Sequence, residues 1–398
     1  VTLFRQQFLS AVMAFAVASV LLAAVVRPSV GAAGRVLALL VLPVYVSAFV
    51  YVGFNYEDLI LELAFGEPRV IAIGVILIVA VCDVVLRTAG LGLFSVVIAS
   101  LAVVFLPSRL MDAMGLRSAS AADALPYLAL DPGSMFGPPL AIGAIVVPAF
   151  ILFGHAMFST RGGDFLLDFS LRLMGAFRGG AAKVAVVAST FFGSISGSAV
   201  SNVVSTGVLT IPLMRRTGYR PAEAAAVEAV ASTGGQLMPP VMGAAVFIMA
   251  EFLQIDYTEI LLAALVPALL YYLSLFVIID RIGAFRAAGR ITTTERVTFR
   301  FLLTGSHFFV AIAILLVAML PLRLAPEAAA LSSAAFLFAT TLLVVARSLD
   351  RALFFKLVRA PVDAGFTLVP LLCILAGAGL VAGAINFTGV AFNISLFL

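Results

Sequence analysis

The sequence predicts an all-α protein with many membrane-spanning helices, and two observations lead to this fold class. Of its 398 residues, 63% are hydrophobic and only 11% are charged, whereas charged residues make up about 25% of a typical soluble domain. The apolar residues also form long uncharged runs, and about 20 such residues suffice for one helix to cross a bilayer. A β-barrel is excluded, because its strands would appear as alternating segments of about 10 residues. The uncharged runs cover residues 8–26, 36–54, 88–108, 132–160, 184–214, 229–250, 260–279, 301–320, 328–346 and 364–398, and a shorter one covers 70–82.

Basic residues are concentrated in alternate connections between these runs, and this pattern predicts an orientation in the membrane. Lys and Arg are enriched in cytoplasmic loops, and one alternating assignment places 19 of the 24 basic residues on the cytoplasmic side. Under it the chain starts outside, so we expect a helix upstream of residue 1. The predicted cytoplasmic loops are 27–35, 83–87, 161–183, 215–220, 280–300 and 347–359, the last an amphipathic stretch expected to lie on anionic membrane lipid.

The run 184–214 fits this orientation only if it does not cross the membrane. Lys183 precedes the run and Arg215 follows it, so both of its ends are predicted to be cytoplasmic. The sequence GSISGS at 193–198 interrupts its middle, and each half of about 10–16 residues has the length of a re-entrant segment. We therefore predict a helical hairpin; one long tilted helix broken by glycine is the alternative. Irregular backbone at membrane depth is tolerated only in a protein interior or along a cavity, so the tip predicts a binding site.

The next run predicts a second irregular element. Residues 232–236, STGGQ, stand ahead of Pro239 and Pro240 inside the run 229–250. Two prolines remove helical donors and clash with the preceding turn, so we predict a discontinuous helix whose freed carbonyls face a site. An ordinary proline kink is the alternative. Glu223 and Glu228 are expected to stabilise the start of this helix, with a gating role for Glu228 as the second possibility.

A weak internal repeat points to a transporter. Residues 154–159, GHAMFS, match 383–388, GAINFT. The two copies have opposite orientations in the predicted topology, which is the inverted-repeat plan of many secondary transporters. A hairpin and a broken helix follow the first copy only, so we expect this chain to be a fragment of a longer permease.

Other classes of protein are disfavoured by what the sequence lacks. Cys82 and Cys373 lie in separate apolar runs, and His155 and His307 have no acid or thiol at ligand spacing, so no disulfide, zinc, haem or iron–sulfur site is predicted. The basic residues are scattered between spans, which argues against nucleic-acid binding. An intramembrane serine hydrolase would need Gly-x-Ser-Gly, and Ser194 breaks that motif before Ser196. The protein is therefore predicted not to be an enzyme, while another ion-coupled transporter or a channel stays open.

Two segments carry a family resemblance. The chain is similar to the tripartite ATP-independent periplasmic (TRAP) transporters at KVAVVASTFFGSISGSAVSNVVSTGVLTIPLMRRTGY (183–219) and EAVASTGGQLMPPVMGAAVFIMAEF (228–252). It resembles the TAXI-type fused permease, in which a small four-helix subunit is joined to a large twelve-helix subunit. NYED at 55–58 and GEP at 66–68 resemble the small-subunit part, so the likeness covers nearly the whole chain.

The resemblance implies a permease of the bacterial inner membrane that imports an organic acid of the carboxylate or dicarboxylate class. Import would use a sodium gradient or, in some members, protons, with no other cofactor. A periplasmic TAXI-family binding protein would deliver the substrate, and an elevator motion of the hairpin-containing domain would carry it. Sodium, the only metal expected, would lie between hairpin tips and interrupted helices.

The resemblance also carries site residues over to this chain. Asn202 stands where dicarboxylate members often have Asp, which leaves the number or identity of the ions open. Removal of the side-chain oxygen of Ser198 or Thr233 is expected to weaken sodium-dependent uptake. The implied ion- and substrate-binding residues are Ser194, Ser196, Gly197, Ser198 and Asn202 at the hairpin tip, Ser232, Thr233, Gly234, Gln236 and Pro239 in the broken helix, and Thr388 in the second repeat.

Four regions follow from these predictions. Residues 1–131 would form the small-subunit-like region and linker, and 132–300 the first repeat, with its hairpin at 184–214 and its broken helix at 222–250. Residues 301–360 would supply scaffold helices and the amphipathic segment, and 361–398 the start of the second repeat.

Overall fold

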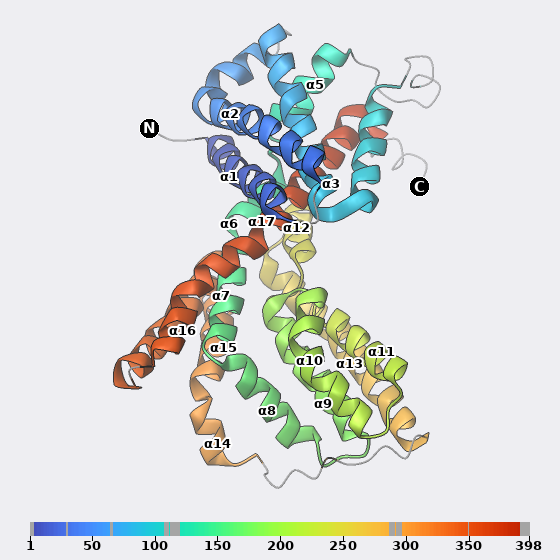
Figure 1. Ribbon diagram of the computed structural model, residues 1–398, viewed down its shortest axis with the longest axis vertical. Coiled ribbons are helices and arrows are strands. Elements are labelled where there is room, and N and C mark those ends of the chain that lie inside the picture. Colours follow the sequence, from blue (N-terminus) through green and yellow to red (C-terminus); the bar gives the residue numbers. More distant parts are fainter. Residues whose placement is uncertain are drawn as a thin grey trace. The chain divides into compact units, whose positions relative to one another are not determined.

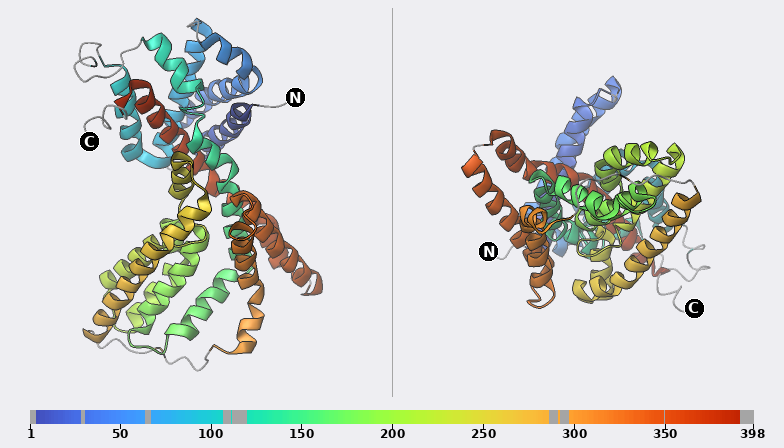
Figure 2. Two further views of the ribbon diagram at one scale, coloured as in Figure 1. Left: turned by 180° about the vertical axis from the view of Figure 1, so that it is seen from behind. Right: turned by 90° about the horizontal axis from the view of Figure 1, so that it is seen from below.

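The computed structural model describes residues 4–28, 31–63, 67–106, 111, 120–285, 291, 297–348 and 350–390, and every regular element among them is a helix (Figures 1 and 2). This confirms the predicted all-α polytopic membrane fold. By their contacts the residues form two compact units, Val1–Ile145 with Gly365–Leu398, and Val146–Ala364. Within the described residues, the helices long and apolar enough to span a membrane are Arg5–Val26, Ala32–Glu62, Pro68–Val104, Pro138–Ser159, Tyr257–Phe285, Pro326–Ala346 and Arg351–Thr388.

The first unit is built on a pair of long apolar helices. In it α1 and α2 pack along each other, and the buried Ser10 hydroxyl of α1 donates to the Phe49 carbonyl of α2 at 2.5 Å. The Phe49 ring meets Phe136 edge to face, with centroids 6.3 Å apart, in one continuous apolar core. The helices of this unit are α1 (Arg5–Val26), α2 (Ala32–Glu62), α3 (Pro68–Val104), α5 (Ala121–Leu130), α6 (Pro138–Ile145) and the last part of α17 (Arg351–Thr388).

The breaks between helices in this unit differ in position from those that the sequence predicts. The helix that contains the uncharged run 36–54 ends well after that run, because α2 continues past a non-helical Asn55 to Glu62. The turn predicted at 83–87 lies within α3, and the helix breaks instead at Gly90, with φ 75°. Asp83 and Arg87 form an ion pair one helical turn apart, with Nε–Oδ1 2.8 Å.

The second unit contains two groups of packed helices. In one group α9, α10, α11 and α13 lie side by side with α8 along α9, and in the other α7 and α15 pack on α16 (Figures 1 and 2). The first group has its own apolar core, which includes Ala182, Val186 and Ile279. The helices of this unit are α7 (Val147–Ser159), α8 (Gly162–Met174), α9 (Gly180–Ser196), α10 (Ala199–Arg216), α11 (Pro221–Gly234), α12 (Ala244–Leu253), α13 (Tyr257–Phe285), α14 (Phe299–Thr304), α15 (Ser306–Met319), α16 (Pro326–Ser348) and the first part of α17.

The amphipathic segment predicted at 347–359 covers the end of α16 at Ser348 and the start of α17 at Arg351, and its position on membrane lipid stays a prediction. From Arg351 onward it forms the first turns of α17, which continues without a break to Thr388. The two copies of the internal repeat both end a helix, at Ser159 in α7 and at Thr388 in α17. Their inverted orientation and the division into four regions stay predictions. Gly66 and residues 286–290, 292–296, 349 and 391–398, on which parts of these predictions fall, lie outside the described residues.

Candidate functional site

The hairpin predicted at 184–214 turns at its glycine–serine break. Helix α9 ends at Ser196, and Gly197 takes the left-handed conformation with φ 62°, which a glycine adopts without steric cost. Ser198 is the N-cap of α10, and its hydroxyl oxygen accepts a hydrogen bond from the Ser201 amide at 3.3 Å. The two helices have 17 and 18 residues, longer than the expected halves. The chain thus reverses at the predicted position, while its entry into the membrane from the cytoplasm stays a prediction.

The broken helix is interrupted over nine residues. Helix α11 ends at Gly234, and α12 starts only at Ala244. The intervening chain makes tight turns, including Leu237 N–Gly234 O at 3.0 Å, and closes with Gly243 N–Gln236 O at 3.0 Å. The peptide between Pro239 and Pro240 is cis. The element is therefore a discontinuous helix and not a proline kink, because neither proline lies within a helix.

The hairpin tip and the broken helix are in direct contact through their backbones. The Val241 amide donates to the Ser194 carbonyl at 3.0 Å. Gly193 and Gly235 approach so closely that a side chain on either would collide with the backbone of the other. Gly197 lies against the Met242 carbonyl in the same way. Small residues at these positions are what allow two irregular segments to meet without side chains between them.

A buried aromatic cluster supports the interrupted segment from the other side. The Tyr257 hydroxyl at the start of α13 donates to the carbonyls of Pro240 and Val241, at 3.0 and 2.8 Å. Its ring stacks on Phe247 of α12 with centroids 4.4 Å apart, and Phe150 of α7 packs on both rings. The break is therefore held in one shape by hydrogen bonds to its own carbonyls.

A polar cluster that sequence reasoning missed lies between α9, α10 and α11. Glu228 was expected at the start of a helix, but it lies in the middle of α11 with a fully buried side chain. Four hydroxyls surround its carboxyl group. Ser189 and Ser232 lie 3.2 and 3.3 Å from Oε1, Thr206 makes a shorter contact with Oε1, and Thr210 makes a shorter contact with Oε2.

Asn202 joins this cluster to the hairpin. Its Nδ2 donates to the Ser189 carbonyl at 2.8 Å, and its own carbonyl accepts from the Thr206 hydroxyl at 2.8 Å. The side chain is 1% exposed, and its Oδ1 has no hydrogen-bond partner among the described residues. A buried amide oxygen without a donor is unusual, because such groups are nearly always hydrogen-bonded.

The predicted site residues divide by exposure. Ser194, Asn202, Ser232 and Gly234 are buried, whereas Ser196, Gly197, Ser198 and Pro239 are half-buried at the tip and the break. Thr233 and Gln236 are exposed, and the Thr233 hydroxyl donates back to the Ala229 carbonyl of its own helix at 2.8 Å. Thr388 belongs to the other unit, where its buried hydroxyl donates to the Ala384 carbonyl at 2.7 Å.

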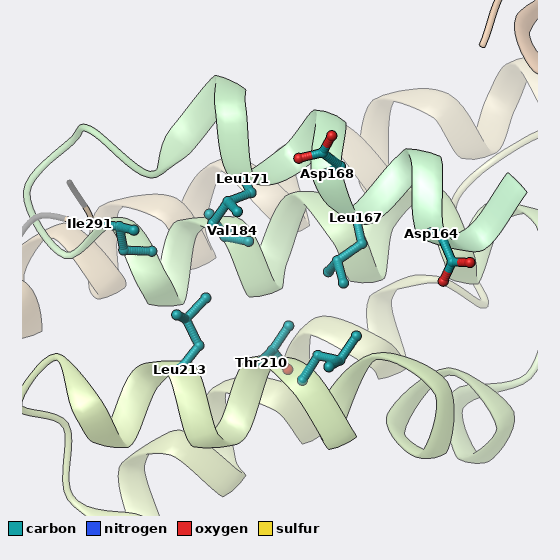
Figure 3. Close-up of a pocket in the computed structure, with 9 residues that line it drawn as sticks. Asp164, Leu167, Asp168, Leu171, Val184, Thr210, Leu213 and Ile291 are labelled. Carbon is teal, nitrogen blue, oxygen red and sulfur yellow. The ribbon is translucent and has the colours of Figure 1, made fainter. Parts of the chain in front are cut away.

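A cavity of about 390 Å³ adjoins the polar cluster. Figure 3 shows Thr210 and Leu213 of α10 on one side and residues of α8 and α9 on the other. Thr210 therefore has one surface at the cavity and its hydroxyl on Glu228. The cavity is lined by Asp164, Leu167, Asp168, Leu171, Val184, Leu209, Thr210, Leu213 and Ile291.

Among the residues that the structure describes, no group of three His, Cys, Asp or Glu side chains is placed to hold a metal ion. Oxygens supply the chemistry at the hairpin and the break: carbonyls, hydroxyls, one amide and one carboxyl. Such oxygen ligands suit hard cations. The amino end of α10 at Ser198 adds a partial positive charge, which favours an anion.

Comparison with known proteins agrees with this architecture. The model of the family "tripartite ATP-independent periplasmic transporter, DctM component" matches residues 76–398. The C4-dicarboxylate TRAP transporter large permease protein DctM of Pseudomonas aeruginosa is 34% identical over 156 residues, which are 38% of this chain and 36% of that protein.

Two further relatives are similar over comparable segments. The large permease protein DctM of Vibrio cholerae is 33% identical over 34% of this chain and 29% of its own length. The 2,3-diketo-L-gulonate TRAP transporter large permease protein YiaN of Escherichia coli is 27% identical over 32% of this chain and 29% of its own length. The matched segments thus span about a third of these curated relatives. On the family match, this multi-pass inner-membrane protein is a transporter component and not an enzyme, and it belongs to the DctM family of TRAP transporter permeases.

Proposed function

We propose that the hairpin and the broken helix form one half of the ion- and substrate-binding site of an organic-acid importer. Import would be driven by sodium, and a periplasmic TAXI-type binding protein would deliver the substrate. The hairpin-containing group of helices would carry the bound substrate by an elevator motion. The single observation that carries this proposal is the backbone contact between Ser194 and Val241, because it brings two interrupted helices to one place.

The chemistry at this place suits a cation beside an anion. Interrupted helices leave carbonyls and helix ends inside the protein, which is how many secondary transporters bind ions and substrates. The amino end of α10 would attract a carboxylate, while hydroxyl and carbonyl oxygens would bind sodium. A membrane potential supplies about 2.3 kcal/mol per charge per 100 mV, so two sodium ions would readily drive the entry of a monocarboxylate.

The names of the relatives support an organic acid as the substrate class. They are named for C4-dicarboxylate, 2,3-diketo-L-gulonate and sialic acid. All three are carboxylates at neutral pH. The family description names a tripartite periplasmic system, which supports a soluble partner that captures the substrate.

Uptake into proteoliposomes tests this proposal. The intact permease and its binding protein would be assayed with Ser198→Gly, Thr233→Val and, as a matched control, Ser205→Ala. Glycine is tolerated at an N-cap at a cost of only a few tenths of a kcal/mol, so Ser198→Gly removes the oxygen and preserves the hairpin. Ser205 lies on the same helix, exposed, with its hydroxyl bonded to the Ser201 carbonyl.

We expect a higher sodium requirement in the Ser198 and Thr233 variants and an unchanged one in the control. Loss of about 1 kcal/mol of ion binding would raise the half-saturating sodium concentration about fivefold. If sodium dependence is unchanged in both variants, these residues do not belong to the ion site. If wild-type uptake ignores sodium, sodium coupling itself is wrong.

A further inference from the structure

Glu228 is a carboxylic acid enclosed by protein on every side. Its side chain is 0% exposed, and it extends from the middle of α11 toward the two hairpin helices. The nearest polar groups to its oxygens are the hydroxyls of Ser189, Thr206, Thr210 and Ser232. The sodium site proposed above uses the hairpin tip and the helix break, and it leaves the carboxyl group of Glu228 without an assigned function.

The charged groups on the neighbouring helices pair with other residues or are exposed at a helix end. No ion pair of Glu228 occurs among the described residues, and an ionised carboxylate in an apolar interior is very costly unless it is paired. Lys183 on α9 pairs with Asp280 of α13 at 2.6 Å, and Asp168 on α8 pairs with Arg172. Arg215 and Arg216 are exposed at the end of α10. The hydroxyls of Tyr271 and Tyr272 on α13 donate to the carbonyls of Val230 and Ala231.

Neutral hydroxyls are the groups that hydrogen-bond to Glu228 among the described residues. The Thr206 and Thr210 hydroxyls also contact the carbonyls of Asn202 and Thr206. Those carbonyls lie within α10 and accept its backbone amides as well, so both hydroxyls can donate to the carboxyl group. Hydroxyl groups bring no positive charge to balance a buried carboxylate. A hydrogen bound to the carboxyl group would remove its negative charge.

A route for that hydrogen is present. Thr210 lines the cavity of about 390 Å³, and its hydroxyl contacts Glu228 Oε2, so this one residue separates the cavity from the carboxyl group. Asp164 and Asp168 lie at the same cavity, as Figure 3 shows. The cavity also contacts the start of α9 and the end of α10, where Lys183 and Arg215 carry the charge that predicts the cytoplasmic side.

We propose that Glu228 is a proton-binding site of this permease, loaded and unloaded once per transport cycle. The carboxylate accepts one proton from the outer side, forming an O–H bond, and that bond breaks when the proton passes to water through Thr210 and the adjoining cavity on the predicted cytoplasmic side. The electron count does not change. The inference extends the proposed transport function, because it assigns a second coupling ion to the same group of helices.

Proton movement can be measured directly. The intact permease, with its binding protein, would be reconstituted in proteoliposomes that contain a trapped pH-sensitive dye. We expect substrate uptake to acidify the lumen in the wild type, and Glu228→Gln to reduce this acidification to the level of liposomes without protein. Glu223→Gln is the matched control, because it lies in the first turn of the same helix and glutamine keeps its capping contact with the Arg220 amide.

A second measurement does not depend on transport. Infrared spectroscopy of the purified permease would detect the carbonyl band of a buried, protonated carboxylic acid. We expect that band in the wild type and in Glu223→Gln, and its loss in Glu228→Gln. A wild type without the band, or a Glu228→Gln variant with undiminished proton entry, would overturn the proposal.

The same experiments distinguish proton binding from sodium binding at Glu228. If Glu228→Gln raises the sodium requirement and leaves proton entry intact, Glu228 is a sodium ligand and the proton proposal is wrong. If wild-type uptake fails to respond to sodium while the infrared band is present, sodium coupling fails and the proton site stands. Thr210→Val is expected to slow proton entry and leave the infrared band in place, because it interrupts the route and keeps the acid.

Discussion

The Val241 amide donates a hydrogen bond to the Ser194 carbonyl at 3.0 Å, which fastens the break in one element to the tip of the other. Because both atoms belong to the main chain, this bond does not depend on the chemistry of either side chain. It depends instead on how closely the two backbones approach. The stability of the site is therefore most sensitive at the glycines and at the groups that hold the break in place.

Replacement of Gly197 by alanine is expected to destabilise the hairpin. The left-handed conformation costs roughly 1–2 kcal/mol for a residue with a Cβ, and that Cβ would collide with the Met242 carbonyl. Thermal unfolding in detergent should show a lower midpoint and reduced uptake. Gly92→Ala is the control, since nothing lies within 4 Å of a Cβ there. Equal midpoints for the two variants would contradict the observed tip geometry.

Replacement of Tyr257 by phenylalanine should weaken the support of the break. The change leaves the carbonyls of Pro240 and Val241 without their shared donor, and a lost buried hydrogen bond typically costs about 1–3 kcal/mol. Tyr271→Phe removes a hydroxyl from a more exposed bond to Val230 and is expected to cost less. The two unfolding midpoints give the comparison, and a Tyr257 variant as stable as the Tyr271 variant would refute this role.

The ends of the hairpin are expected to lie on one side of the membrane. Single cysteines would replace Ala176, before α9, and Arg216, at the end of α10, in a background without Cys82 and Cys373. A membrane-impermeant maleimide should label both positions in inside-out vesicles and neither in right-side-out vesicles. Labelling of the two positions from opposite sides would turn the hairpin into a crossing and remove the basis of the predicted topology.

Asp280 is expected to matter for how α13 holds the start of the hairpin. It pairs with Lys183 at 2.6 Å and with Arg178, and the Lys183 side chain is only 12% exposed. Asp280→Asn would leave that ammonium group nearly buried without its carboxylate. The unfolding midpoint should fall by a few degrees, and by less at high salt. Glu62→Gln, which breaks the more exposed pair with Arg69, should change it little.

The hairpin and the break could be predicted because their signals are local. Basic residues at both ends of one apolar run, a glycine–serine interruption and two adjacent prolines are all visible in the sequence. The turn before Gly90 was misplaced because the prediction followed the charges of Asp83 and Arg87, whereas the backbone breaks at the glycine, which is free to adopt φ 75°. Charge locates the side of a membrane better than it locates the end of a helix.

The role of Glu228 was missed for the opposite reason. Its partners come from three helices, and only packing brings Ser189, Thr206 and Thr210 onto one carboxyl group. Part of the signal is nevertheless in the sequence. Thr206 and Thr210 are four residues apart, as are Glu228 and Ser232, so each pair shares a helix face. A buried face of hydroxyls opposite a carboxyl is the pattern to look for.

The contact between Gly193 and Gly235 constrains how the molecule can work. The two backbones are in direct contact there, so no lipid or water molecule fits between the hairpin and the broken helix unless this contact breaks. We therefore expect the hairpin and the broken helix to move as one rigid unit, and the proposed substrate to pass beside this contact and not between the two backbones.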